Sequence, residues 1–91
     1  MSSIKDKKIR LRYFAWIRER IGYDHEDLSV PETVQTVHEL LNYLAHLGEN
    51  YACALSSSET IYIALNQEQV GYDHAIKDND EIAIFPPMTG G

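Results

Sequence analysis

The residues best suited to chemistry stand in the final segment, which reads Phe85-Pro86-Pro87-Met88-Thr89-Gly90-Gly91. Because glycine has no side chain and tolerates backbone angles closed to other residues, a Gly-Gly segment can enter a narrow active-site channel with its carboxylate leading. An α-carboxyl group has a pKa of about 3.5, so at neutral pH it is an anion able to attack a nucleoside triphosphate and form a mixed anhydride. We therefore expect the Gly91 carboxylate to be the reactive group. The alternative is a loose, inert terminus.

Two prolines before the glycines favour the reactive interpretation. Pro86 and Pro87 each fix φ near about −65° and lack an N–H, so they end strand pairing and direct the following residues outward. The four residues 88–91 span about 13 Å when extended, which is enough to place a carboxylate inside a partner enzyme. We expect residues 86–91 to form a flexible tail in which Pro86, Pro87, Thr89 and Gly90 present Gly91.

Other reactive side chains lack the spacing of a site. Cys53, the single cysteine, follows Ala52 in an apolar segment, which predicts a buried packing residue and no sulfur chemistry. The four histidines show no H-x-H or H-x-x-x-H spacing and are expected to be solvated or capping residues. Asp78, Asp80 and Glu81 lack the ligand pattern of a calcium loop, so they indicate a polar turn. We expect no bound metal and no bound cofactor.

Composition limits the partners and the compartment. A chain of 91 residues makes a single domain over residues 1–91, with too little material for a deep catalytic cleft. Fourteen acidic against eight basic residues give a formal charge of −6, which disfavours nucleic acid and anionic membranes and favours a basic protein surface as the partner. With one cysteine, no secretory signal and no apolar stretch longer than residues 61–65, the expected location is the cytoplasm.

Hydrophobic spacing predicts the elements that must hold the tail. Residues 9–14 alternate between apolar and polar side chains, as in a half-buried strand, with Phe14 as an apolar exception on the polar side. Gly22 is suited to ending a helix, and Asn79 is suited to a left-handed turn before the last strand. The expected order is a strand over residues 9–14, a short helix over 15–21, a strand over 25–30, the main helix, a helical turn over 51–55, and strands over 61–65, 69–72 and 81–85.

The main helix has the clearest local signal. Thr36 and Glu39 form a T-x-x-E capping box, in which each side chain satisfies an N–H at the start of a helix. Gly48 stands where the helix is expected to stop. A mixed four- to five-stranded sheet packed on one main helix is the α+β arrangement called the β-grasp, or ubiquitin-like, fold. The side chains expected to be buried against the sheet recur at helical spacing and are Val37, Leu40, Leu41, Leu44 and Leu47.

Three segments carry a resemblance to a known family. They are Tyr13-Phe14-Ala15 with Arg18-Glu19 and Gly22, the turn Asp78-Asn79-Asp80-Glu81, and the ending Phe85 to Gly91. Together they resemble the small subunits of molybdopterin synthase over almost all of the chain after about Lys7. The pattern F-P-P-x-[TS]-G-G is highly specific when it closes a β-grasp domain of this size. Several relatives carry an apolar residue where this chain has Gln69.

The resemblance implies a sulfur carrier. In that family an activating enzyme adenylates the terminal glycine with ATP, and a persulfide-derived sulfur displaces AMP to leave a thiocarboxylate, so Gly91 is the implied site. The tail then enters the large subunit of a heterotetramer, where its sulfur attacks a cyclic pyranopterin monophosphate during molybdenum cofactor biosynthesis. The resemblance further implies that the large subunit holds the active site, that this chain is a non-catalytic subunit, and that Phe14, Phe85 and Met88 contact that partner.

Other functions stay open at this point. The same fold and tail serve sulfur carriers for thiazole or transfer RNA thiolation, and ubiquitin-like modifiers attached to lysines, which predict isopeptide-linked conjugates. A β-grasp interaction module with an inert terminus is a further alternative. The Phe85-Pro86-Pro87 segment favours the molybdopterin branch. For Phe14 and Phe85, the alternative to a partner surface is inward packing.

Overall fold

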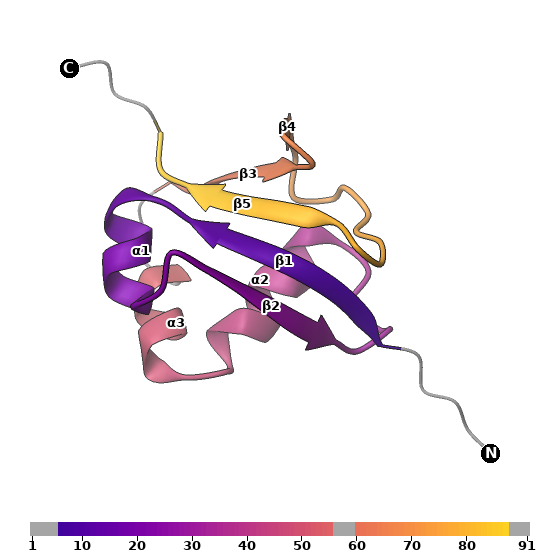
Figure 1. Cartoon of the computed structure of the whole chain (residues 1–91), viewed down its shortest axis with the longest axis horizontal. Coiled ribbons are helices and arrows are strands. Elements are labelled where there is room, and N and C mark those ends of the chain that lie inside the picture. The colour runs from indigo at the N-terminus through magenta and orange to yellow at the C-terminus, as the bar shows by residue number, and fades with distance from the viewer. Residues whose placement is uncertain (1–5, 56–59, 88–91) are drawn as a thin grey trace.

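The structure, a computed structural model, describes residues 6–55 and 60–87. Five strands form one mixed sheet in the order β2-β1-β5-β3-β4, and three helices pack with it (Figure 1). This is the α+β β-grasp arrangement expected from the sequence. The elements are β1 (Lys7–Tyr13), α1 (Ala15–Ile21), β2 (His25–Val30), α2 (Val37–Ala45), α3 (Glu49–Leu55), β3 (Tyr62–Leu65), β4 (Glu68–Val70) and β5 (Glu81–Phe85).

The neighbouring strands β1 and β5 run parallel, whereas the pairs β1–β2, β3–β5 and β3–β4 are antiparallel. Leu11 lies opposite Ile82, and Tyr13 lies opposite Ile84. Parallel strands place their carboxyl ends at the same edge of the sheet, so the end of β1 lies beside the end of β5. The backbone N–H of Phe14 donates to the carbonyl oxygen of Ile84 at 3.2 Å, which fixes this neighbourhood.

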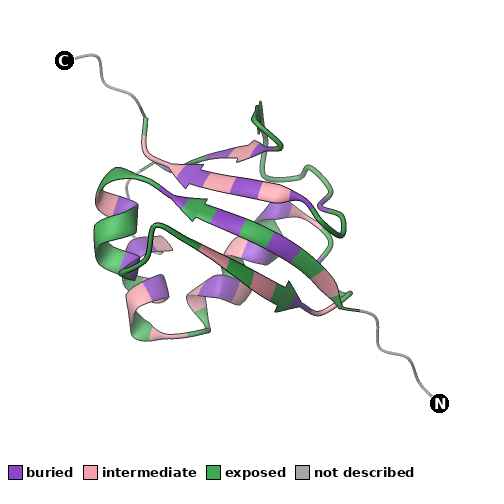
Figure 2. Cartoon of the chain, in the orientation of Figure 1, coloured by how far each residue is buried: buried purple, intermediate pink, exposed green. Residues whose placement is uncertain are grey.

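Alternation along the strands gives the sheet one buried and one open face. In β1, buried and exposed residues alternate from Lys8 to Tyr13, as the colours of the strand show (Figure 2). The buried side chains pack on apolar residues of the helices, including Ile17 of α1 and Leu40 of α2, to form one core. We call the side that packs on the helices the helical face and the other side the open face. The strand residues of the helical face are Ile9, Leu11, Tyr13, Val30, Ile63, Leu65, Ile82 and Ile84.

The capping box of α2 is confirmed. The Glu39 backbone N–H donates to Thr36 Oγ1 at 3.2 Å, and the Thr36 backbone N–H donates to Glu39 Oε1 at 3.2 Å. The predicted end of this helix is wrong, because α2 stops at Ala45 and Leu47 is 42% exposed. The backbone N–H groups of His46 and Leu47 bond to carbonyls three residues back, which tightens the last turn and carries the chain off the helix axis before Gly48.

The prediction that Cys53 is buried is wrong. Helix α3 buries Tyr51 and Ala54 against the rest of the molecule, and Cys53 lies between them on the outer side, exposed to solvent. An apolar segment that folds as a helix has both an inner and an outer face, and the sequence alone does not show which residue lies on which.

The fourth strand also differs from its predicted range of residues 69–72. It covers Glu68–Val70, and the chain after it crosses to the start of α2. There the carbonyl oxygens of Tyr72 and His74 accept the backbone N–H groups of His38 and Val37, at 2.8 and 3.0 Å. Tyr72 thus satisfies a helix terminus instead of extending the sheet. No helix in the part of the chain that the structure describes is long and apolar enough to cross a membrane.

Candidate functional site

The chain leaves the sheet at the end of β5. This strand ends at Phe85, as predicted, and the chain continues into half-buried Pro86 and exposed Pro87. The remaining predicted site residues, Met88, Thr89, Gly90 and Gly91, lie outside the described residues. The site can therefore be characterised by what surrounds the point where the chain leaves the sheet.

Three aromatic side chains surround this point, and we call Phe14, Tyr62 and Phe85 the exit patch. Tyr62 lies opposite Phe85 in the sheet, with their ring centroids 6.0 Å apart. Phe14 follows the pair Tyr13–Ile84, which points into the core, so Phe14 falls on the open face with Phe85. Phe14 is 42% exposed, Tyr62 is 36% exposed, and Phe85 is half-buried.

Two residues of the exit patch, Phe14 and Phe85, were predicted to lie on the surface, and the third, Tyr62, was not predicted. Phe14 and Phe85 do not pack into the core, so the inward-packing alternative is wrong for both. Their contact with a partner stays a prediction. Sequence reasoning missed Tyr62, because its place beside Phe85 depends on the pairing of β3 with β5. Exposed, clustered aromatic side chains are typical of protein interaction sites.

The backbone beside Phe14 is strained. Phe14 is extended, with φ −130° and ψ 152°, whereas the next residue, Ala15, has φ 56°. An L-residue other than glycine in this left-handed region costs about 1–2 kcal/mol. The sharp turn at Ala15 lets the chain pass directly from β1 into α1 and leaves the Phe14 side chain at the surface. Strain of this kind tends to persist at functional positions, because surrounding structure enforces it.

At its opposite end, β5 is held by side-chain hydrogen bonds. Asn79 has φ 69°, which confirms the predicted left-handed turn. Asp80, predicted as part of a polar turn, is only 8% exposed, and its carboxylate accepts Asn66 Nδ2 at 2.9 Å and the Lys77 backbone N–H at 2.7 Å. Asn66 Oδ1 accepts the backbone N–H of Glu81 at 2.9 Å. These bonds hold the start of β5 in place. The position of the strand in turn determines where the chain leaves the sheet after Phe85.

A carboxylate on the helical face fixes the end of β1. Glu26 Oε2 accepts the hydroxyl groups of Tyr13 at 2.7 Å and of Tyr51 at 2.6 Å, which joins β1, β2 and α3. Burial raises the pKa of both phenols well above the usual value, and the hydrogen bonds to Glu26 raise it further. Both tyrosines are therefore neutral donors at physiological pH. Because Tyr13 is held inward, the next side chain, Phe14, is directed outward.

His25 and His46 form contacts with residues close to them in the sequence. Asp24 Oδ1 and His25 Nδ1 are 2.7 Å apart, and this hydrogen bond lowers the pKa of the Asp24 carboxyl group. His46 caps the end of α2. Within residues 6–55 and 60–87, no three His, Cys, Asp or Glu side chains are grouped so that they could hold a metal ion. The exit patch, which is aromatic, is suited to binding a protein surface.

Comparison with known proteins places the chain in a family. The model of the ThiS family matches residues 11–91. The chain belongs to the ThiS family. Among curated relatives of this ThiS-family chain is the molybdopterin synthase sulfur carrier subunit of Escherichia coli (strain K12), which is 36% identical over 83 residues. The match covers 91% of this chain and 99% of that protein.

Two solved structures show the same fold. The solution structure of the small archaeal modifier protein 1 from Methanosarcina acetivorans has 25% sequence identity and a TM-score of 0.70, with 96% of this chain and 99% of that chain covered. A chain in the complex of subunits 1 and 2 of the molybdopterin-converting factor from Helicobacter pylori 26695 has 24% identity and a TM-score of 0.64, with 92% and 99% covered. At that identity the second likeness concerns the fold.

Proposed function

We propose that this chain is the sulfur carrier subunit of a molybdopterin synthase and that Gly91 carries the sulfur as a thiocarboxylate. The observation that carries the proposal is the relationship to the sulfur carrier subunit of Escherichia coli, at 36% identity over 99% of that protein. The family match extends through residue 91, so it includes the Gly-Gly segment. The exit patch and the two prolines fit a tail that is inserted into a partner.

Activation begins at the Gly91 carboxylate. One of its oxygens attacks the α-phosphorus of ATP, a C–O–P bond forms, and pyrophosphate leaves. A persulfide on a sulfur-donating protein then attacks the acyl carbon, and AMP leaves with the electron pair of the broken C–O bond. A thiol cleaves the resulting acyl disulfide, being oxidised to a disulfide with the donor, and the Gly91 thiocarboxylate is released. These steps require an adenylating enzyme as a second partner.

Sulfur transfer takes place in the large subunit. The thiocarboxylate sulfur is a soft nucleophile that is anionic near neutral pH, so it needs no neighbouring general base from this chain. It forms a C–S bond at a pterin carbon whose C–O bond breaks, so that the oxygen substituent leaves; water then adds to the acyl carbon and the acyl C–S bond breaks, which leaves sulfur on the pterin and restores the Gly91 carboxylate. Two such transfers supply the two sulfurs of the dithiolene. The exit patch binds the large subunit, which supplies the groups that orient the pterin and move its protons.

A ubiquitin-like modifier is the second candidate function. The likeness to the small archaeal modifier protein 1, with a TM-score of 0.70, favours it. Both functions use an activated Gly91 carboxylate and differ in the acceptor, which is a pterin for the sulfur carrier and a lysine amine for the modifier.

Reconstitution separates the two functions. The chain is incubated with ATP, an adenylating enzyme and a persulfide donor, then with the large subunit and the cyclic pterin monophosphate. Intact mass should show one oxygen replaced by sulfur, and the pterin should gain two sulfurs, whereas a sample without ATP should show neither change. An unchanged mass would contradict the sulfur carrier, and isopeptide-linked conjugates in host extracts without pterin conversion would favour the modifier.

A further inference from the structure

The open face carries a row of cations along β1. Lys8, Arg10 and Arg12 are alternate residues of this strand and are all exposed, so their side chains project from the open face at intervals of about 7 Å. The neighbouring strands contribute two carboxylates to this face, Asp27 opposite Arg10 in β2 and Glu81 opposite Arg10 in β5. A third carboxylate lies at the start of the row, where Asp78 Oδ1 accepts the Lys8 backbone N–H at 2.7 Å, so three exposed cations meet three carboxylates.

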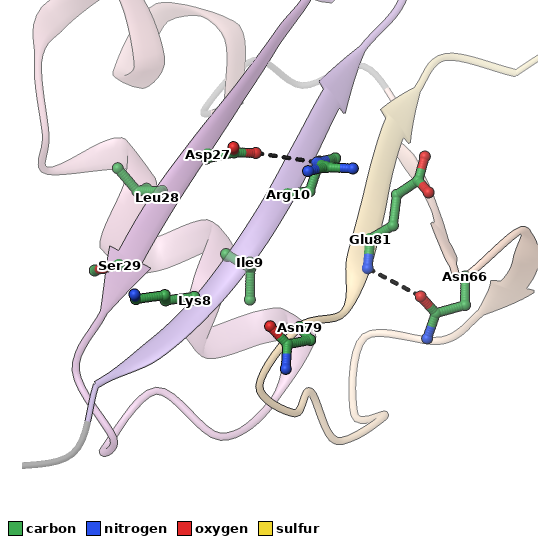
Figure 3. A pocket seen from close by; sticks show the side chains of 9 residues that line it. All are labelled: Lys8, Ile9, Arg10, Asp27, Leu28, Ser29, Asn66, Asn79 and Glu81. Carbon is green, nitrogen blue, oxygen red and sulfur yellow. Dashed lines mark hydrogen bonds and ion pairs between the residues drawn. The ribbon is translucent and has the colours of Figure 1, made fainter.

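A polar hollow lies over the part of this row formed by Lys8 and Arg10. It has a volume of about 620 Å³, and Lys8, Arg10, Asp27, Ser29 and Glu81 are among the side chains that line it. These side chains come from β1 and from the strands on either side of it (Figure 3). A hollow of this size accommodates several side chains of another polypeptide.

The ion pairs in the hollow and at its edge are easily exchanged. Arg10 Nε lies 3.1 Å from Asp27 Oδ1, with both side chains more than 60% exposed, and Arg12 Nη1 lies 3.3 Å from Glu81 Oε2. Exposed pairs of this kind contribute little to stability, because water screens them. A partner that excludes water from the hollow and brings its own carboxylates forms stronger, charge-assisted hydrogen bonds with the same guanidinium groups.

We propose that this hollow binds an acidic segment of the protein that covers the exit patch, with its carboxylates pairing with Lys8 and Arg10 in the hollow and with Arg12 beside it. The inference rests on the proposed function, which supplies a partner for the open face. Two observations select this occupant: the row of three exposed cations, and continuity with the exit patch, because Arg12 stands two residues before Phe14 on the same face. The net charge of −6 predicts a basic partner surface, whereas the proposal places an acidic segment over β1.

Charge reversal tests the proposal by calorimetry with the large subunit of the same organism at low ionic strength. Arg10→Glu and Arg12→Glu should each weaken the complex by at least about tenfold, because a like charge then faces the partner's carboxylates. Arg20→Glu is the matched control, with the same charge change on α1, where the Arg20 guanidinium stacks 4.4 Å from the Trp16 ring. It should change the affinity by less than about threefold, and Arg10→Lys should retain binding.

Each other outcome overturns the proposal in a recognisable way. Wild-type binding with unchanged or tighter binding of Arg10→Glu would show that no acidic segment occupies the hollow, and the proposed function would stand. If the wild type does not bind the large subunit, both this proposal and the proposed function are contradicted. Self-association of the wild type that Arg10→Glu abolishes, measured by sedimentation, would assign the hollow to a second copy of this acidic chain and overturn the proposal.

Discussion

The helical face and the open face of the sheet are made by the same strands and differ in what their side chains do. In β1, Ile9, Leu11 and Tyr13 are at most 2% exposed, whereas Lys8, Arg10 and Arg12 between them are exposed. In β5, Ile82 and Ile84 are buried, and Phe85 belongs to the exit patch. We therefore expect alternate residues of one strand to serve folding and binding separately, so that the two can be changed independently.

The largest effect is expected on the helical face. Leu11 is fully buried, so Leu11→Ala should lower the free energy of unfolding by about 2–5 kcal/mol through lost burial and the cavity left behind. Arg10→Ala, one position away on the open face, should change it by no more than about 0.5 kcal/mol. Urea unfolding of both variants measures the difference. Equal losses of unfolding free energy in the two variants would contradict the division of roles between the two faces.

The exit patch should show the reverse behaviour. Phe85→Ala should weaken binding to the large subunit by about 2 kcal/mol or more, because a clustered aromatic side chain at the centre of an interface is a typical hot spot. The isolated domain should keep its thermal stability, whereas Ile84→Ala, the buried neighbour, should lose it. Calorimetry and thermal melting check both. Unchanged affinity of Phe85→Ala, or collapse of its fold, would contradict this assignment.

The turn that leads into β5 belongs to neither face of the sheet. A substitution there changes backbone strain without changing core burial or the exit patch. Asn79 has φ 69°, and Asn79→Val should therefore lower the free energy of unfolding by about 1–2 kcal/mol, since a β-branched residue fits this region badly. Asn79→Gly should be neutral or mildly stabilising. Identical melting curves of the two variants would argue against strain at this position.

The smallest effect concerns the tyrosines that hold the end of β1. The pKa of Tyr51 is raised by burial and by its hydrogen bond to Glu26, so the folded state keeps the proton that the unfolded state loses above about pH 10. This stabilising contribution is complete below that pH and is lost as the pH rises above it. The difference in the free energy of unfolding between the wild type and Tyr51→Phe should therefore be smaller at a pH of about 11 than at a pH of about 8. An equal difference at the two pH values would contradict the raised pKa of Tyr51.

Features encoded by neighbouring residues could be predicted from the sequence. The capping box of Thr36 and Glu39, the helix that ends before Gly22, and the left-handed turn at Asn79 all depend on contacts within a few residues. The bounds of β2 and β5 were also predicted correctly, because each is delimited by turn residues. The residues that determine these elements are close together in the sequence, so sequence reasoning can identify them.

Features that depend on distant segments could not be predicted. Tyr62 joins the exit patch only through the register of β3 on β5, and Tyr72 leaves the sheet because its carbonyl caps α2. Cys53 is exposed because of the way α3 is oriented on the core. The row of cations on the open face was hidden in the same way, since a net charge of −6 does not show that Arg10 and Arg12 share one side of the sheet.

Deletion of Gly91 tests the central claim most directly. The deletion withdraws the carboxylate by about 3.5 Å, which is large against the roughly 1 Å tolerance of positioned chemistry. The core side chains within residues 6–55 and 60–87 lie between Ile9 and Ile84, so the deletion removes none of these. Thiocarboxylate formation with ATP should therefore be lost while the melting temperature stays unchanged, and a residue appended after Gly91 should be equally damaging. Full sulfur loading and pterin conversion by either variant would contradict the claim that Gly91 carries the sulfur.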